Sequence, residues 1–190
     1  LLTGAAQTIP AWLANSCGVP ESRPEPLGAR EARKTILLRS GWQTENIGDI
    51  AHTPGMLQLL ELHLPEADVI VWSNALDRGV EAMLRRNFPN VRIVSGGTDS
   101  HGRPDTVELA EAFDRADFLL HGSGPAVVAR SHLDAWRRRT GKPYGIFGVT
   151  VALRAEAASG ALDAQLRETL EAAAFVFTRE TASLKNLQQA

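Results

Sequence analysis

Short, continuously apolar runs alternate along this chain with longer segments in which apolar residues recur at helical spacing. Strands that are apolar on both faces suit a sheet covered by helices on both sides, because neither face then meets water. The alternation is typical of βαβ units around a parallel sheet. We therefore predict an α/β fold with an open, mostly parallel, six-stranded Rossmann-like sheet and helices on both faces. The predicted strands cover residues 35–39, 68–72, 91–94, 117–121, 144–147 and 174–178.

The helices are predicted between these strands, and Gly, Pro, Asp or Asn separates each of them from its neighbours. A chain of 190 residues with 44% hydrophobic content is large enough to bury a core around such a sheet. We assign this α/β domain to residues 34–190. The predicted helices cover residues 55–64, 80–87, 106–115, 127–139, 162–172 and 181–189.

Residues 1–33 are predicted to form an N-terminal arm and linker, because the prolines within residues 20–26 prevent a regular ladder of hydrogen bonds. Residues 1–14 are small and apolar, and two interpretations remain open: the remnant of an export signal, or a loosely docked arm. The run is too short, and too interrupted by Pro10, to span a bilayer. We expect a bacterial protein of the cytoplasm or the membrane periphery, or an exported one if the signal interpretation holds.

Composition and spacing exclude several classes of function. A net charge of -2 lacks the basic excess that binding to a phosphate backbone needs, so nucleic acid is not an expected partner. Because Cys17 is the only cysteine, neither an intrachain disulfide nor a thiolate zinc cluster can form. The histidines show no H-x-x-x-H or H-E-x-x-H spacing, so we predict neither a metal site nor a cofactor.

The turn after the first strand, residues 40–49, carries the strongest chemical signal. Gly41 and Gly48 allow a sharp turn and close approach of a ligand, and the N–H groups at the following helix start favour an anion. Asn46 and Asp49 lie at this helix start, and His52 follows close enough to exchange a proton with a ligand in the same pocket. The alternative is that Asn46 and Asp49 only cap the helix and that His52 is an exposed first-turn residue.

A second glycine turn, Gly122-Ser123-Gly124, follows the fourth strand. Carboxyl ends of parallel strands lie at one edge of the sheet, where open α/β folds bind their ligands, so the two turns can face one pocket. Neither turn has the dinucleotide or P-loop spacing, and no serine has a nucleophile-elbow motif. Trp42, inside the first turn, is a candidate for stacking on a sugar ring.

Arg179 follows the sixth strand at the same edge, where its forked donors suit a carboxylate or a phosphate. Glu180 is a candidate for orienting Arg179, and Ser183 is a candidate for serving the start of the next helix. The alternative is a local ion pair of Arg179 together with a helix cap.

Three motifs in this order resemble the polysaccharide pyruvyl transferase family: Asn46-Ile47-Gly48-Asp49 after the first strand, the turn at residues 122–124, and the segment TRETASL at residues 178–184. The resemblance implies a two-domain fold like that of GT-B glycosyltransferases, of which this chain would be the N-terminal half. It also implies transfer of a pyruvyl group from phosphoenolpyruvate to a glycan acceptor as a ketal, for a cell-surface polysaccharide.

For this reaction we predict three catalytic groups: Asp49 as acid/base or sugar-orienting group, His52 as proton donor or acceptor, and Arg179 as anion clamp. The predicted substrate contacts are Gly41, Trp42, Asn46, Gly48, Gly122, Ser123, Gly124, Glu180 and Ser183. Two other functions remain open. One is a GT-B-like glycosyltransferase that uses a nucleotide sugar, and the other is a non-catalytic domain that binds a sugar or an anion.

Overall fold

The computed structural model describes residues 33–152 and 162–189. The predicted N-terminal arm, with the signal remnant proposed for residues 1–14, lies outside the described residues except for Arg33. The six strands are β1 (Thr35–Ser40), β2 (Asp68–Ser73), β3 (Arg92–Ser95), β4 (Phe118–His121), β5 (Tyr144–Val149) and β6 (Val176–Thr178).

All pairings in the sheet are parallel, and the strand order is β3-β2-β1-β4-β5-β6. Strand β1 is central: its Leu37 pairs with Ile70 of β2 on one side and with Leu119 of β4 on the other. The predicted six-stranded, parallel, Rossmann-like α/β fold is confirmed. Each predicted strand boundary lies within two residues of the observed one.

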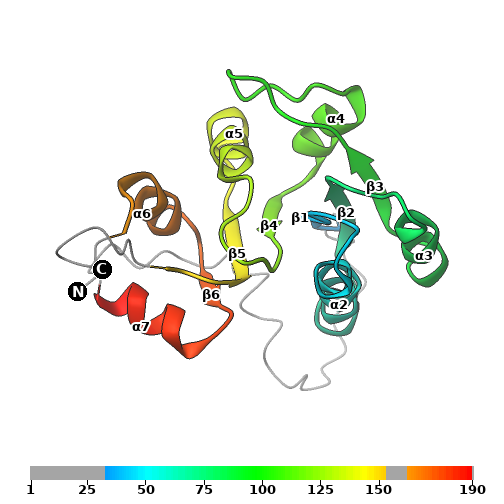
Figure 1. Cartoon of the computed structure of the whole chain (residues 1–190). Helices are drawn as coiled ribbons and strands as arrows, with labels where there is room; N and C mark the ends of the chain where they lie inside the picture. Colours follow the sequence, from blue (N-terminus) through cyan, green and yellow to red (C-terminus); the bar gives the residue numbers. More distant parts are fainter. Residues whose placement is uncertain (1–32, 153–161, 190) are drawn as a thin grey trace, which may run out of the picture.

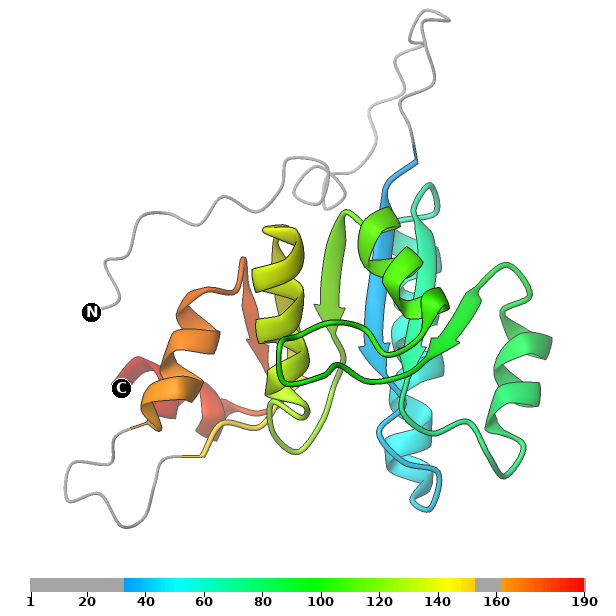
Figure 2. The same cartoon turned by 90° about the horizontal axis from the view of Figure 1, so that it is seen from above.

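Helices cover both faces of the sheet (Figures 1 and 2). Helices α2 (Ile47–His63) and α3 (Val80–Asn87) lie on one face, and α4 (Val107–Arg115), α5 (Arg130–Thr140) and α6 (Ala164–Glu171) lie on the other. The last helix, α7 (Thr181–Gln189), follows β6 and packs beside it. Two separate hydrophobic cores result, one against α2 and α3 and one against α4, α5 and α6. Alternate residues of the central strand contribute to each core, because successive side chains of a strand point to opposite faces of the sheet.

The start of α2 corrects one sequence prediction. The helical pattern indicated a helix over residues 55–64, but α2 begins at Ile47 and contains Pro54. Proline and glycine are typical of helix ends, so Pro54-Gly55 marked the wrong boundary. The helix starts earlier because Asn46 caps it, accepting a hydrogen bond from the N–H of Gly48 at 2.8 Å. Pro54 cannot donate an intrahelical hydrogen bond and its ring crowds the preceding turn, yet the helix continues through it to His63.

The chain order reverses between β1 and β4, from which the sheet grows outward in both directions. In open α/β sheets the crevice outside the carboxyl ends of the strands at such a reversal is the usual ligand site. The two glycine turns of the sequence follow β1 and β4. The topology therefore brings both turns to the two sides of this crevice.

Substitution of two glycines, one in crowded and one in open surroundings, tests how tightly the strand and helix positions are packed. A Cβ atom at Gly145 in β5 would lie 2.4 Å from the ring of Phe175, whereas a Cβ at Gly55 in α2 would meet nothing within 4 Å. We expect Gly145→Ala to lower the free energy of unfolding by about 1–3 kcal/mol, because Phe175 must move. Gly55→Ala should raise it by about 0.5–1 kcal/mol, since alanine favours the helix. Denaturant unfolding of both variants checks this, and equal effects of the two substitutions would contradict the packing described for β5.

Candidate active site at the junction of β1 and β4

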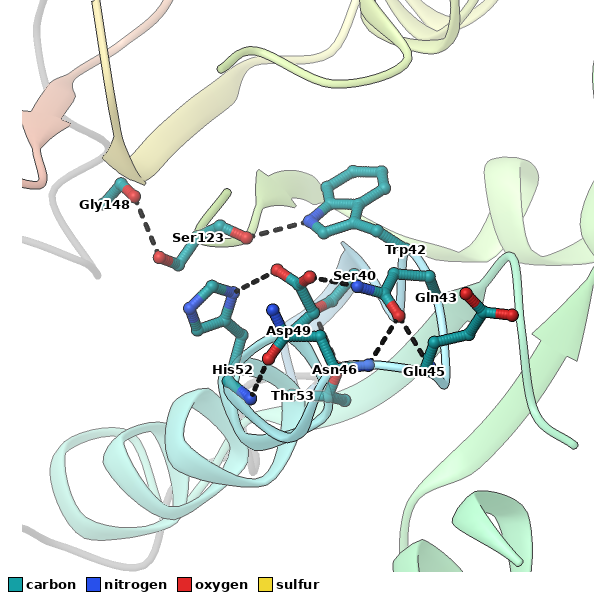
Figure 3. Close-up of polar contacts among 11 residues, drawn as sticks. Ser40, Trp42, Gln43, Glu45, Asn46, Asp49, His52, Thr53, Ser123 and Gly148 are labelled. Atoms are coloured by element: carbon teal, nitrogen blue, oxygen red, sulfur yellow. Dashed lines mark hydrogen bonds and ion pairs between the residues drawn. The ribbon is translucent and has the colours of Figure 1, made fainter. Parts of the chain in front are cut away.

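Trp42 ties the turn after β1 to the turn after β4. Its indole Nε1–H donates a hydrogen bond to the carbonyl oxygen of Ser123 at 2.8 Å (Figure 3). The hydroxyl of Ser123 in turn donates to the carbonyl of Gly148, also at 2.8 Å. Gly148 has φ +73°, and a Cβ there would lie 3.0 Å from the Ser123 hydroxyl, so this close approach needs glycine. Three strand ends are thus joined across the crevice.

The glycines of the two turns allow neighbouring segments to pack closely against the backbone. Gly41 has φ +70°, and a Cβ there would lie 2.2 Å from Oγ of Ser73 at the end of β2. A Cβ at Gly122 would lie 3.0 Å from Oγ of Ser40, and one at Gly124 would lie 3.3 Å from the indole nitrogen of Trp42. These positions hold β1, β2 and β4 together at the edge. Their predicted contact with substrate stays a prediction.

Asp49 and His52 form a carboxylate–imidazole pair in the first two turns of α2. His52 Nδ1 lies 3.9 Å from Asp49 Oδ1 and makes no hydrogen bond within the described part of the chain. The Asp49 side chain is 22% exposed and the His52 side chain is 18% exposed. Both point toward the Ser123–Gly148 contact (Figure 3). The Nδ1 atom of His52 is buried, so a ligand would reach the imidazole through its other nitrogen, Nε2.

Gln43 fixes the orientation of this pair and was not singled out from the sequence. Its side-chain carbonyl accepts hydrogen bonds from the backbone N–H groups of Glu45 at 2.6 Å and Asn46 at 2.9 Å. Its amide nitrogen donates to Oδ2 of Asp49. Because both ends of the amide are engaged, Gln43 couples the loop to the carboxylate. No spacing rule in the sequence reveals this contact, since it depends on the turn of the loop.

A buried arginine lies at the end of β1, packed on the α5 side of the crevice. Arg39 is 1% exposed and sits between two indole rings, 4.5 Å from the centroid of Trp42 and 4.9 Å from that of Trp72. Its Nε donates to Nδ1 of His132 at 3.0 Å, and Nη1 donates to the carbonyls of Ser40 at 3.0 Å and Trp72 at 3.1 Å. Among the described residues no carboxylate pairs with Arg39, and burial lowers its pKa to about 10.

Two histidines complete this cluster in neutral form. The Nε2 of His121 lies 2.7 Å from the carbonyl of Val128, which can only accept, so Nε2 carries the proton. The Nδ1 of His132 accepts from Arg39, so that nitrogen is unprotonated. Burial, aided by the charge of Arg39, lowers the pKa of each imidazole to about 4. These tryptophans and histidines lie far apart in the sequence, and pairing of β1 with β2 and β4 brings them together.

The segment after β6 lies at the same edge but does not join the Asp49–His52 pair. Ser183 is 1% exposed, accepts from the N–H of Val151 at 2.7 Å and donates to Glu180. Glu180 also accepts from the hydroxyl of Thr150 at 3.2 Å. These contacts hold the start of α7 against the end of β5, and the predicted contact of Glu180 and Ser183 with substrate stays a prediction. Arg179 is exposed, and its guanidinium has no acidic partner among the described residues.

Within residues 33–152 and 162–189, no three His, Cys, Asp or Glu side chains gather closely enough to hold a metal ion. None of the helices in these ranges has the length and apolar character needed to cross a bilayer.

A family model described as "Polysaccharide pyruvyl transferase" matches residues 46–190. No curated protein matches the sequence. Among solved structures, the chain is similar to a UDP-GlcNAc 2-epimerase from Neisseria meningitidis bound to UDP-GlcNAc, with a TM-score of 0.44, 14% identity, and coverage of 85% of this chain and 36% of that chain. It is also similar to a UGT transferase from Siraitia grosvenorii in complex with UDP, with a TM-score of 0.37, 14% identity, and coverage of 63% and 28%. The chain thus spans about a third of the epimerase's length.

The buried histidines predict an acid-sensitive fold. The pKa of His121 is about 4 in the folded protein and 6.5 for an ordinary imidazole, so the unfolded state binds more protons between these values. The free energy of unfolding should therefore fall as the pH drops from about 6.5 to about 4, by on the order of 3 kcal/mol from His121.

Denaturant unfolding at several pH values checks this. His121→Gln, whose amide can still donate to Val128, should flatten the pH dependence. The same change at the exposed His63 serves as the control and should leave the dependence unchanged. An unchanged slope in His121→Gln would contradict the burial of a neutral His121.

Proposed function

The chain belongs to the polysaccharide pyruvyl transferase family, and on this premise we propose that it takes part in transferring a pyruvyl group from phosphoenolpyruvate to a glycan acceptor as a ketal. The observation that supports this most directly is the Asp49–His52 pair, held by Gln43 at the crevice between β1 and β4. Ketal formation from an enol phosphate needs an acid that protonates the methylene carbon and a base that takes the proton of a sugar hydroxyl. A carboxylate beside an imidazole supplies both functions near neutral pH.

The proposed reaction joins two hydroxyls of one sugar to the central carbon of phosphoenolpyruvate and releases phosphate. Protonation of the methylene carbon of phosphoenolpyruvate leaves positive charge at the adjacent carbon, and one sugar hydroxyl adds there and loses its proton to the base. The carbon–oxygen bond to phosphate then breaks, and a second hydroxyl of the same sugar adds to that carbon. Its proton leaves with the base or the released phosphate. The products are one pyruvyl ketal and one inorganic phosphate, with no oxidant or cofactor required.

His52 is assigned the proton donation and Asp49 the orientation of the imidazole or of a sugar hydroxyl. His52 Nδ1 is buried and lies 3.9 Å from Oδ1 of Asp49, so the proton donation is assigned to Nε2 (Figure 3). Arg179, exposed and without an acidic partner among the described residues, is assigned to the anionic donor. The second domain that the family resemblance implies would complete the site.

Substitution of the pair on the full-length protein tests the proposal. We expect Asp49→Asn and His52→Gln each to reduce kcat for phosphate release from phosphoenolpyruvate with a glycan acceptor by about 10²-fold or more. His63→Gln, at the exposed end of the same helix, is the matched control and should retain activity. Thermal unfolding should show that all three variants fold.

Activity with a nucleotide sugar but not with phosphoenolpyruvate would contradict this proposal and favour the function of a GT-B-like glycosyltransferase. Sugar or anion binding without any turnover would favour the non-catalytic domain. Full activity in both Asp49→Asn and His52→Gln would remove the assigned roles of the pair.

A further inference from the structure

The side-chain amide of Gln43 can lie in only one orientation between the loop and Asp49 (Figure 3). Backbone N–H groups can only donate, so the atom that faces Glu45 at 2.6 Å and Asn46 at 2.9 Å is the carbonyl oxygen Oε1. The amide nitrogen Nε2 then faces Oδ2 of Asp49, and an amide nitrogen can only donate. Oδ2 of Asp49 therefore accepts this hydrogen bond and carries no proton.

The helix that carries Asp49 is anchored to the central strand, so the contact with Gln43 sets the direction of the carboxylate. Thr53, one turn further along α2, is buried, and its hydroxyl lies 2.9 Å from the hydroxyl of Ser40 at the end of β1. Because α2 is held at this point, the hydrogen bond from Gln43 turns the carboxylate rather than moving the helix. The second oxygen, Oδ1, is the one that faces His52.

The buried Nδ1 of His52 faces this second oxygen at 3.9 Å. The separation is about 1 Å longer than an ordinary hydrogen bond. Within residues 33–152 and 162–189, Nδ1 makes no hydrogen bond. A buried ring nitrogen beside an unprotonated carboxylate is favoured in its N–H form. In the neutral ring the proton then lies on Nδ1, and Nε2 is the nitrogen left to exchange protons.

The other charged side chains of this loop and of the segment between β2 and α3 pair with one another. Arg78 lies 3.2 Å from Glu45 and 3.9 Å from Asp77. The turn after β4, residues 122–129, contains no charged residue. Among the described contacts, the Asp49 side chain therefore meets one neutral donor and one imidazole.

We propose that Gln43 is a positioning residue that keeps Asp49 an unprotonated carboxylate, so that His52 alone exchanges protons with the substrate, through Nε2. This inference rests on the proposed function and assigns both proton transfers at the reacting atoms to one group. Nε2–H protonates the methylene carbon of phosphoenolpyruvate, and the same nitrogen then takes the proton of the first sugar hydroxyl. The proton of the second hydroxyl leaves with the phosphate. Asp49 stabilises the positively charged imidazole and keeps its own protonation state throughout.

Gln43→Glu separates this role from support of the loop. An ionised carboxylate still accepts from the two backbone N–H groups, but it cannot donate to Asp49. A protonated carboxyl has nearly the shape of the amide and donates as the amide does. In the full-length protein, kcat for phosphate release from phosphoenolpyruvate with a glycan acceptor should fall about 10-fold or more near neutral pH, with KM changed less than about 3-fold. The loss relative to the wild type should shrink as the pH is lowered, because protonation restores the donor.

Gln58→Glu is the matched control, since it makes the same substitution on the exposed side of α2. It should leave kcat and its pH dependence unchanged. If Gln43 only supports the loop, Gln43→Glu keeps both acceptor contacts and should equal the wild type at every pH. That result would overturn the positioning role and leave the proposed reaction intact. Thermal unfolding should show that both variants fold.

Nitrogen-15 NMR of the full-length protein, labelled on histidine, reports the same arrangement without turnover. In the neutral ring of His52 we expect the proton on Nδ1 in the wild type and in Gln58→Glu, and a shift of this proton toward Nε2 in Gln43→Glu. His52→Gln identifies the signal. A proton on Nε2 in the wild type would overturn the inference, even in an active enzyme. If the proton lies on Nδ1 and shifts in Gln43→Glu, but the wild type releases no phosphate, the positioning by Gln43 is supported and the proposed function is wrong.

Discussion

The central position of β1 is the constraint on which the rest of the structure depends. Because β1 pairs with β2 on one side and β4 on the other, the sheet grows in opposite directions from this strand pair. The turns after β1 and β4 then lie side by side, and the Trp42–Ser123 hydrogen bond can form. Gln43, Asp49, His52 and Ser123 are placed by these two turns or by the helix that follows the first, whereas Arg179 follows β6. The chemistry of the site is thus a consequence of the topology.

The buried Arg39 shows that this junction is not built for stability alone. Removing a cation from water without a carboxylate partner costs several kcal/mol, and hydrogen bonds to carbonyls and to His132 offset only part of that. An aliphatic side chain between Trp42 and Trp72 would avoid the cost. Burial, with a contribution from the charge of Arg39, lowers the pKa of His121 and of His132, and the hydrogen bond from Arg39 requires an unprotonated Nδ1 on His132. The cluster therefore works as one unit, in which the position of Trp42 depends on Arg39.

Cations are spread along the carboxyl edge rather than gathered at one point. Arg39 lies at the end of β1, Arg130 at the start of α5 and Arg179 after β6, whereas the Asp49–His52 pair lies at the start of α2. Of these three arginines, Arg39 is buried and Arg130 is paired with Asp163, whereas Arg179 is exposed.

The sequence by itself determined the α/β class and the six strands, because these follow from local patterns of apolar and turn residues, but it predicted the start of α2 at Gly55 rather than at Ile47. It also identified Asp49 and His52, whose three-residue spacing in a helix guarantees proximity. Only the tertiary structure decided which turns share the crevice, since strand order is not encoded in any single segment. It brought Arg39, Trp42, Trp72, His121 and His132 into contact. It also placed Ser183 in the interior, because this depends on how α7 packs against the end of β5.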